Sequence, residues 1–291
     1  MPYYSQIDLH THSNKSDGEL PPAELVVKAA NSGIKMLALT DHDTISGLHD
    51  AKKAAIKENI NLISGVELST QWDNKTIHIL GLNIDTKNKL VIKACDELKT
   101  LREMRAKKIA QALTKAGIKG SYEYVKKIAI DRSITRYHFA RFLVDHKYAK
   151  NQRDVFKKFL VKSKPGYVSM EWPKLNETIN LINTAGGIAV IAHPLRYKMT
   201  ATKLGKLIDE LSLSSTKPYR RPNALPVRSS GFPRHSARGI ILVNNGLYVS
   251  PSQKGTCLGV CSMTCVKSKK RQDTHTTGCC GLLPPCLCGQ V

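Results

Sequence analysis

Asp8-Leu9-His10-Thr11-His12 lies at the end of the first predicted strand, and Asp17 follows five residues after His12. Successive side chains of a strand alternate between its two faces, so His10 and His12 point to the same side. The loop that follows can bring Asp17 to them. Two imidazoles and one carboxylate suit a divalent transition metal. This stretch therefore predicts a metal site at the end of a strand.

Four more predicted strands carry a histidine or a glutamate at or near their ends. They are Met36–Thr40, followed by His42; Leu62–Leu68, with Glu67; Thr76–Ile84, with His78; and Ile188–Ala192, followed by His193. Amphipathic helical patterns alternate with these strands, which indicates an α/β fold with a mainly parallel sheet. The carboxyl ends of parallel strands share one edge, where the active sites of such folds lie. Because more than four ligands would meet there, we expect two or three metals rather than a structural zinc.

Residues 87–164 interrupt this alternation. Leu90–Ala116 is rich in lysine and has apolar residues at three- and four-residue spacing, which predicts a long basic helix. Further helical patterns follow without a strong strand, and Pro165-Gly166 closes the segment. We therefore expect a helical insert over 87–164 within a main domain formed by 1–86 and 165–212. The lysines and arginines of the 99–108 stretch are expected on the surface of the insert.

The charge of the chain points to polyanions. Its 291 residues include 45 Lys+Arg and 23 Asp+Glu, a formal net charge of +22, which favours nucleotides or nucleic acid as partners. The N-terminal sequence lacks the basic and apolar segments of a secretory signal, and no apolar run approaches the roughly 18 residues that cross a bilayer. We expect a cytoplasmic chain with no membrane association, and we infer no protein partner.

Several of these motifs resemble those of the polymerase and histidinol phosphatase (PHP) superfamily. They are Asp8-Leu9-His10-Thr11-His12-Ser13 with Ser16-Asp17-Gly18, Leu39-Thr40-Asp41-His42-Asp43-Thr44, Gly65-Val66-Glu67 and His193-Pro194. Residues 1–212 as a whole are similar to the branch of phosphoesterases that hydrolyse nucleoside 3′,5′-bisphosphates and trim short RNAs from the 5′ end. The resemblance implies a distorted (β/α)7 barrel, incomplete here at its C-terminus, that hydrolyses phosphoesters of nucleotides or short RNA.

The resemblance also implies roles for single residues. The metal ligands would be His10, His12, Asp17, His42, Glu67, His78 and His193. Glu67, His193 and Asp17 would take part in catalysis, with Glu67 bridging two metals and a bridging hydroxide as the nucleophile. The family implies two or three divalent metals of the manganese type, and zinc or iron also suits so many histidines. Asp41 would hold a ligand imidazole, whereas we expect Asp43 to cap the following helix.

A phosphate substrate needs fixed cations. Ile134-Thr135-Arg136-Tyr137-His138 resembles the family segment in which an arginine and a histidine two residues later face the substrate phosphate. A helix beginning at this point would add its N-terminal N–H groups. Arg196 is a second candidate for binding phosphate, although the family usually has glycine where Leu195 stands. We expect Arg141 to be solvated.

Residues 213–291 do not fit this scheme. They hold 11 basic residues, one acid and seven of the eight cysteines, without hydrophobic periodicity. Paired Cys-x-x-Cys knuckles are absent, a disulfide scaffold needs an oxidising compartment, and a tail that binds nucleic acid would interleave aromatic residues. The late Asp-x-His ligands of the family have no counterpart in a strand-like context. We interpret the segment as a disordered or aberrant tail that follows a disrupted reading frame near residue 212.

Three functions stay open at this point. The first is a phosphoesterase acting on nucleotides or RNA ends, and the second is a remnant of that family that lacks turnover because its last ligands are missing. The third is an enzyme of the histidinol phosphatase type, against which the insert and its Arg136–His138 segment argue. Packing roles are expected for Trp72, Trp172, Phe139 and Cys95, and surface positions for His49 and His146.

Overall fold

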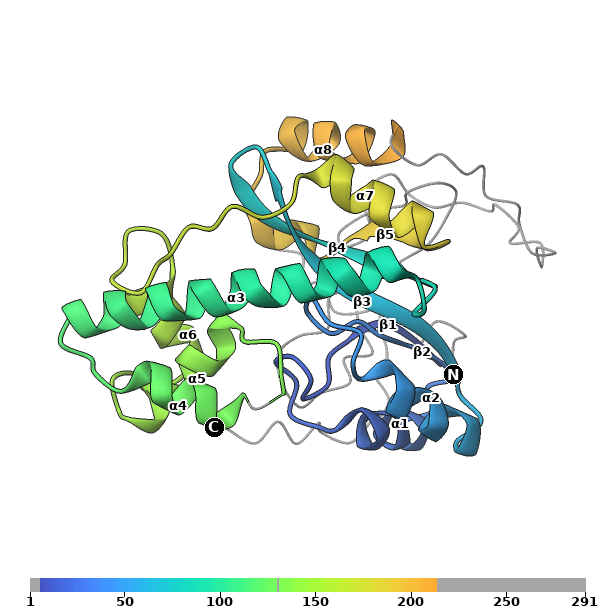
Figure 1. Cartoon of the computed structure of the whole chain (residues 1–291), viewed down its shortest axis with the longest axis horizontal. Coiled ribbons are helices and arrows are strands. Elements are labelled where there is room, and N and C mark those ends of the chain that lie inside the picture. Colours follow the sequence, from blue (N-terminus) through green and yellow to red (C-terminus); the bar gives the residue numbers. More distant parts are fainter. Residues whose placement is uncertain (1–5, 130, 214–291) are drawn as a thin grey trace, which may run out of the picture. The chain divides into compact units, whose positions relative to one another are not determined.

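The structure is a computed structural model that describes residues 6–129 and 131–213, and every structural statement below refers to these residues. Five strands form one curled sheet in the order β1-β2-β3-β4-β5 (Figure 1). They are β1 (Ile7–Thr11), β2 (Met36–Leu39), β3 (Asn61–Trp72), β4 (Lys75–Leu82) and β5 (Ile188–Ile191). The predicted α/β class is confirmed, with the sheet forming a half-barrel. The expectation that the barrel is incomplete at its C-terminus concerns residues beyond 213, which lie outside the described residues.

The direction of β4 differs from that of the other strands. β1, β2 and β3 pair in parallel, whereas β4 is antiparallel to both β3 and β5. The expectation that His78 lies at the carboxyl end of a parallel strand is therefore wrong. His78 lies in the middle of β4, opposite Ser69 of β3, and reaches the site because β4 returns along β3 as a hairpin.

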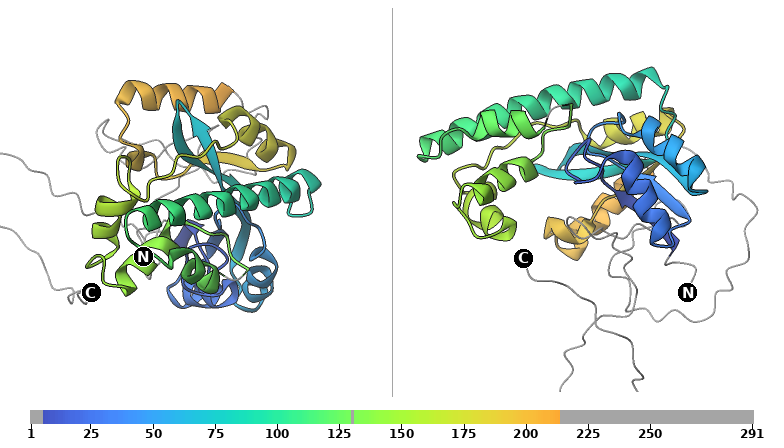
Figure 2. Two further views of the ribbon diagram at one scale, coloured as in Figure 1. Left: turned by 60° about the vertical axis from the view of Figure 1, so that its left-hand side comes forward. Right: turned by 90° about the horizontal axis from the view of Figure 1, so that it is seen from below.

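Helices α1 (Pro22–Asn31) and α2 (Leu48–Lys57) lie side by side and pack against β2 and β3 (Figures 1 and 2). α1 starts with Pro22 and has Glu24 in its first turn, which suits a helix N-terminus. It ends before Gly33, whose φ of 82° few other residues adopt. The buried sides of α1 and α2 form one apolar cluster with Leu37 and Leu39 of β2.

The other end of the sheet packs against α7 (Leu175–Thr184), α8 (Ala201–Leu213) and the first half of α3 (Lys89–Lys115). Here Ile77 and Ile79 of β4 share a core with Ile179 of α7 and Leu207 of α8. A short 3-10 helix, η3 (Pro194–Tyr197), connects β5 to α8. α7, α8 and the first half of α3 therefore support β3, β4 and β5.

The segment between β4 and α7 contains helices and no strand in its described residues. After α3 come α4 (Ser121–Ile128), α5 (Arg136–Asp145), α6 (Gln152–Val155) and a π-helical turn, η2 (Phe156–Leu160). Asn88 caps α3 by accepting hydrogen bonds from the N–H groups of Leu90 and Val91. The second half of α3 packs with α4, α5 and η2 around Phe139 and Phe142 (Figure 2). These helices have a core of their own, and their status as a separate insert stays a prediction.

The remaining expectations about packing divide as follows. Phe139, Trp172 and Cys95 are buried, and His49 and His146 are exposed, as predicted. Trp72 is half-buried and donates a hydrogen bond to Glu210 over 2.7 Å. None of the described helices combines the length and the apolar character needed to cross a membrane. The interpretation of 213–291 as a tail lies outside the described residues.

Candidate metal centre and phosphate site

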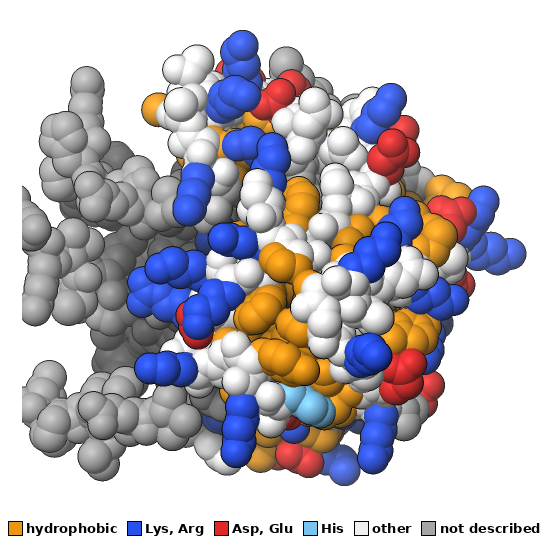
Figure 3. Space-filling model, turned by 90° about the vertical axis from the view of Figure 1, so that its left-hand side faces the viewer, with side chains coloured by type: hydrophobic (Ala, Val, Ile, Leu, Met, Phe, Trp, Pro, Cys, Tyr) orange, Lys and Arg blue, Asp and Glu red, His pale blue; other side chains and the backbone are white. Residues whose placement is uncertain are grey.

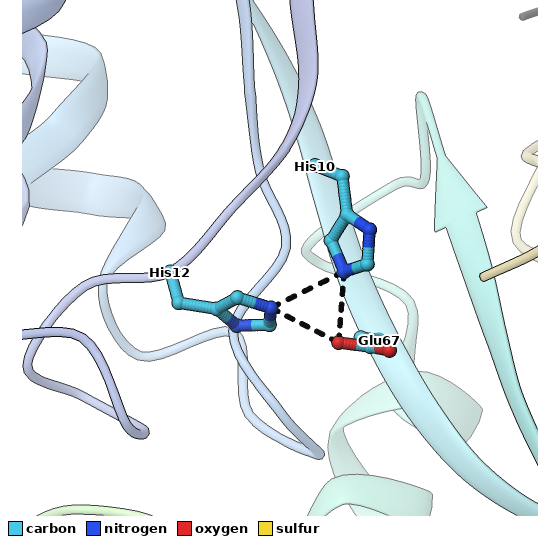
Figure 4. A group of neighbouring side chains, drawn as sticks. All are labelled: His10, His12 and Glu67. Atoms are coloured by element: carbon cyan, nitrogen blue, oxygen red, sulfur yellow. Dashed lines mark hydrogen bonds and ion pairs between the residues drawn. The ribbon is translucent and has the colours of Figure 1, made fainter. Parts of the chain in front are cut away.

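Glu67 of β3 lies at the centre of a ring of imidazoles and has no exposed surface. His10 of β1 and His12, which follows β1, each place Nε2 3.0 Å from Glu67 Oε2 (Figure 4). The same two Nε2 atoms lie 3.2 Å from each other. The prediction that residues two apart in a strand face one site is therefore confirmed for this pair.

Three further histidines contact the same carboxylate from other elements. His78 Nδ1 of β4 and His193 Nε2, after β5, lie 3.0 Å and 2.9 Å from Glu67 Oε1. His42 Nδ1, after β2, lies 3.3 Å from Oε2. The structure therefore brings the five predicted imidazoles together at Glu67, with His78 coming from the middle of β4 rather than from a strand end.

Asp17 adds a second carboxylate on one side of this His–Glu cluster, which we define as His10, His12, His42, Glu67, His78 and His193. Its Oδ1 lies 3.8 Å from His12 Nδ1 and its Oδ2 lies 3.6 Å from His42 Nε2. Three overlapping groups have atoms close enough to hold a metal ion. They are His10, His12 and Glu67; His12, Asp17 and His42; and His42, Glu67 and His78.

Burial and mutual charge determine the protonation of the cluster. Burial alone would raise the pKa of Glu67, but the charges of His42, His10 and His78 hold it well below its usual value. Burial lowers the pKa of His42 well below 6.5, and that of His78 is lowered for the same reason. Burial therefore favours the neutral form of these two imidazoles, in which a ring nitrogen keeps a lone pair for a ligand.

The donor set fits divalent transition metals. Five imidazoles with two carboxylates form a nitrogen–oxygen set that suits manganese, iron or zinc and exceeds the ligands of one structural zinc. The buried Nδ1 atoms of His10 and His193 have no hydrogen-bond partner among the described residues. On each ring this is the nitrogen other than the Nε2 that contacts Glu67. Metals would also relieve the contact between the facing Nε2 atoms of His10 and His12.

Asp41 does not touch an imidazole directly, contrary to the expectation from sequence. Its carboxylate accepts hydrogen bonds from Ser13 Oγ and Ser16 Oγ, both 2.6 Å away, and from Ser13 N–H at 2.8 Å. Ser16 Oγ in turn lies 3.4 Å from His12 Nδ1. Asp41 therefore holds the loop after β1, and it acts on His12 through Ser16.

Asp43 is not a helix cap, and that prediction is wrong. α2 begins after Gly47, four residues later, with no side-chain cap. Asp43 is buried with a left-handed φ of 52°, a conformation that aspartate tolerates better than most residues. Its Oδ1 accepts from Ser69 N–H over 2.6 Å, and its Oδ2 accepts from Arg102 Nε over 2.6 Å.

Arg102 contradicts the prediction that the basic residues of 99–108 lie on the surface. Only 4% of Arg102 is exposed, and its guanidinium also donates to Ser69 Oγ and to the carbonyl of Ile134. The sequence did hold a signal for this position. The buried stripe of α3 runs through Val91, Cys95, Leu98, Ala106, Ile109 and Leu113, and Arg102 falls on that stripe.

Arg105 is a second arginine that the sequence analysis placed on the surface. Its Nε is buried without a partner among the described residues, and its guanidinium lies 5.6 Å from the centre of the Trp172 ring. Burial and the charges of Arg136 and Arg102 lower the pKa of Arg105 to about 9. The three guanidiniums form a cationic group, of which Arg102 has a carboxylate partner in Asp43.

Arg136 and His138 occupy the first turn of α5, as predicted. Thr135 caps this helix, and Thr135 N–H donates to His138 Nδ1 over 3.0 Å. His138 is buried, and burial lowers its pKa to about 4 although the charge of Asp17 opposes the shift. Arg196 lies in η3 and is exposed. Arg141 is exposed, as expected.

Tyr197 is a further residue near the cluster that the sequence analysis missed. Its hydroxyl accepts a hydrogen bond from the N–H of His78 over 2.8 Å. Burial raises the pKa of Tyr197, so the phenol stays protonated. The side chain thereby fixes the backbone of β4 next to a cluster histidine, through η3.

Comparison with known proteins gives several relatives that match more than two thirds of the chain. The chain is 46% identical over 201 residues to a 5′-3′ exoribonuclease of Haemophilus influenzae, spanning 69% of this chain and 73% of that protein. It is 42% identical over 205 residues to a 3′,5′-nucleoside bisphosphate phosphatase of Chromobacterium violaceum, spanning 70% of this chain and 72% of that protein. The 5′-3′ exoribonuclease Rnm of Escherichia coli is 42% identical over 203 residues, 69% of each chain.

A solved structure and a family model agree with these relatives. An amidohydrolase from Chromobacterium violaceum, solved with bound sulfate and no metal, superposes with a TM-score of 0.70 at 41% identity. The superposition covers 72% of this chain and 74% of that one. The model of the PHP domain matches residues 8–211, which contain the whole His–Glu cluster and Asp17. The chain therefore belongs to the PHP domain family.

Proposed function

We propose that this chain is a metal-dependent phosphoesterase that hydrolyses nucleoside 3′,5′-bisphosphates or removes nucleotides from the 5′ end of short RNA. The observation that carries the proposal is the convergence of five imidazoles on Glu67, with Asp17 beside them. Relatives that are 41–46% identical and are named for these two activities support the substrate class. A cytoplasmic location stays a prediction.

The residues proposed to hold two or three divalent metals are His10, His12, Asp17, His42, Glu67, His78 and His193. We propose manganese as the bound metal, with zinc and iron as alternatives for this nitrogen-rich set of ligands. When bound, such metals supply an attacking oxygen of lowered pKa and positive charge opposite the phosphate. Glu67, His193 and Asp17 are the residues we assign to catalysis.

The protein's own groups would orient the phosphate. His138 accepts the Thr135 N–H at Nδ1, so its neutral ring carries the proton on Nε2 and can donate it to a phosphate oxygen. With its pKa lowered to about 4, His138 keeps this neutral form at pH 7. Arg136, in the same helical turn, and the exposed Arg196 would supply positive charge to the anionic substrate.

The test is release of phosphate from adenosine 3′,5′-bisphosphate by the full chain with Mn²⁺, compared with release from histidinol phosphate. Glu67→Gln and His10→Gln should reduce the first activity to background. The matched controls Glu97→Gln and His49→Gln change exposed residues of the same types and should leave it unchanged. Full activity in Glu67→Gln would sink the proposal. A preference for histidinol phosphate would support the histidinol phosphatase alternative instead.

A further inference from the structure

The positive charge of the first 212 residues is concentrated in one segment. Residues 87–164 hold 22 Lys+Arg and 7 Asp+Glu, a net charge of +15. Residues 1–86 and 165–212 together hold 12 Lys+Arg and 15 Asp+Glu, a net charge of −3. Attraction of a polyanion by the described part of the chain therefore has to come from the helices between β4 and α7. Figure 3 shows the side of the molecule to which α4, α5 and α6 belong, where Lys and Arg side chains surround an apolar area and outnumber Asp and Glu.

The densest part of this charge is residues 157–164, which we call the basic segment. It contains Lys157, Lys158, Lys162 and Lys164 and no acidic residue, and all four lysines are exposed. Lys158 pairs with Asp154 over 2.9 Å. The other three lysines have no ion pair among the described residues, so they are available to an external anion.

The basic segment is connected to the metal centre by a short series of contacts. Phe156, directly before it, lies under the Arg136 guanidinium, with 5.8 Å from Cζ to the ring centre. Arg136 opens α5, whose Tyr137 hydroxyl donates to Glu19 over 3.4 Å. The loop before α5 contacts the same region, since Ser133 N–H donates to the carbonyl of Lys15 over 2.7 Å. Asp17 lies between these two contact points, in the loop that joins β1 to α1.

An exposed aromatic residue lies next to the basic segment. Tyr167 N–H donates to the carbonyl of Lys164 over 2.9 Å, and 37% of Tyr167 is exposed. Proteins commonly bind single-stranded nucleic acid with lysines that contact the phosphates and an aromatic ring on which a base stacks. A nucleoside 3′,5′-bisphosphate held at the His–Glu cluster carries one phosphate besides the reacting one, whereas an oligonucleotide carries a run of phosphates that can extend to such a surface.

We propose that the basic segment and Tyr167 form a binding surface for the phosphodiester backbone of single-stranded RNA whose 5′ end lies at the His–Glu cluster. The inference rests on the proposed function and adds to it a preference for oligonucleotides over mononucleotides. Arg136 lies over Phe156, directly before the basic segment, and its positive charge is close enough to lower the pKa of Arg105.

The test compares two triple variants of the full chain. The first is Lys157→Gln with Lys162→Gln and Lys164→Gln, and the control is Lys52→Gln with Lys53→Gln and Lys57→Gln. The control lysines are also exposed and lie on α2, which connects the loop after β2 to the amino end of β3. Both variants change the net charge by the same amount and keep the same basic residues of 213–291.

Binding is measured by fluorescence anisotropy with a 5′-phosphorylated RNA decamer in EDTA, over a series of salt concentrations. Each phosphate contact to a single strand contributes about 0.7 to the slope of log K against log salt, so the first variant should lose about 2 from the slope. Its affinity at moderate salt should fall about tenfold or more, while the control should keep both slope and affinity. Equal losses in the two variants would overturn the proposal. Unchanged binding in the first variant would also overturn it, and would leave an acidic protein as the better partner for the basic segment.

Turnover separates this inference from the proposed function. With Mn²⁺, the ratio of RNA hydrolysis to adenosine 3′,5′-bisphosphate hydrolysis should fall in the first variant and stay constant in the control. Wild-type protein that binds RNA through these lysines but hydrolyses neither substrate would refute the phosphoesterase and leave the binding surface standing. An unchanged ratio in the first variant, in an active enzyme, would refute the surface alone.

Discussion

Arg102 donates from Nε to Oδ2 of Asp43 over 2.6 Å, and both side chains are almost completely buried. The pair joins three elements that carry or adjoin the metal centre. Asp43 directly follows His42, and its other oxygen accepts from the N–H of Ser69, two residues after Glu67. Arg102 belongs to α3 and also donates to Ser69 Oγ over 3.0 Å. Through this ion pair, α3 fixes the loop after β2 against β3.

The first prediction concerns the stability of this arrangement. Arg102→Met keeps much of the side-chain length but leaves the Asp43 carboxylate buried without its partner. Removing one partner of a buried ion pair costs about 3–5 kcal/mol. Urea unfolding of the full chain should show a loss of this order for Arg102→Met. Arg141→Met, which removes an exposed pair with Asp145, should change the free energy of unfolding by less than about 1 kcal/mol. Similar small effects in both variants would mean that the Arg102 pair does not hold the loop.

The second prediction concerns the loop that carries Asp17. A Cβ atom on Gly18 would lie 2.1 Å from the carbonyl oxygen of His12, far closer than any real contact. Gly18→Ala must therefore move the loop relative to His12, and phosphatase activity and metal content should fall together. Gly205→Ala adds a methyl group to α8 where nothing lies within 4 Å, and it should stabilise the chain by about 1 kcal/mol. Normal activity and metal content in Gly18→Ala would contradict the fit of this loop.

The third prediction concerns pH and His138. Burial lowers the pKa of His138 to about 4, compared with 6.5 for the unperturbed side chain. The unfolded chain therefore binds more protons than the folded chain between pH 6.5 and 4, and stability falls as the pH falls through that window. At pH 5 the expected loss from this one group is about 2 kcal/mol relative to pH 7.

His138→Gln isolates the contribution of this group. Glutamine at this position can keep the capping interaction at the start of α5 but cannot take up a proton. In EDTA, urea unfolding at pH 7 and pH 5 should show a smaller loss of stability on acidification for His138→Gln than for the wild type. An equal loss in the two proteins would show that His138 does not titrate between these values.

The histidines were predictable because strand geometry is local. His10 and His12 share a face in any regular strand, and the ends of parallel strands meet at one edge whatever connects them. His78 was expected in the site as a residue near the carboxyl end of a parallel strand. The pattern of a strand in the sequence does not reveal the direction in which that strand runs. The reversal of β4 depends on its hairpin with β3, through Asp73 and Asn74, whose φ values of 46° and 56° suit a tight turn.

The buried charges were harder to predict. Arg102 and Asp43 are far apart in the sequence, and each alone has a more ordinary role, as a solvated helix residue or as a cap. Only the packing of α3 against β3 brings them together and removes water from both. The position of Arg102 on the apolar stripe of α3 was the available signal, and it was outweighed by the many lysines around it.

Metal content of the full chain shows whether the His–Glu cluster and Asp17 hold divalent metals. Wild-type protein and Glu67→Gln are loaded with Mn²⁺, passed over a desalting column and analysed for metal by mass spectrometry, with Glu97→Gln as the control. We expect two or three metals per chain in the wild type and the control, and a loss of at least one in Glu67→Gln. A wild-type chain that holds none or one would contradict a centre of two or three metals and favour the inactive remnant.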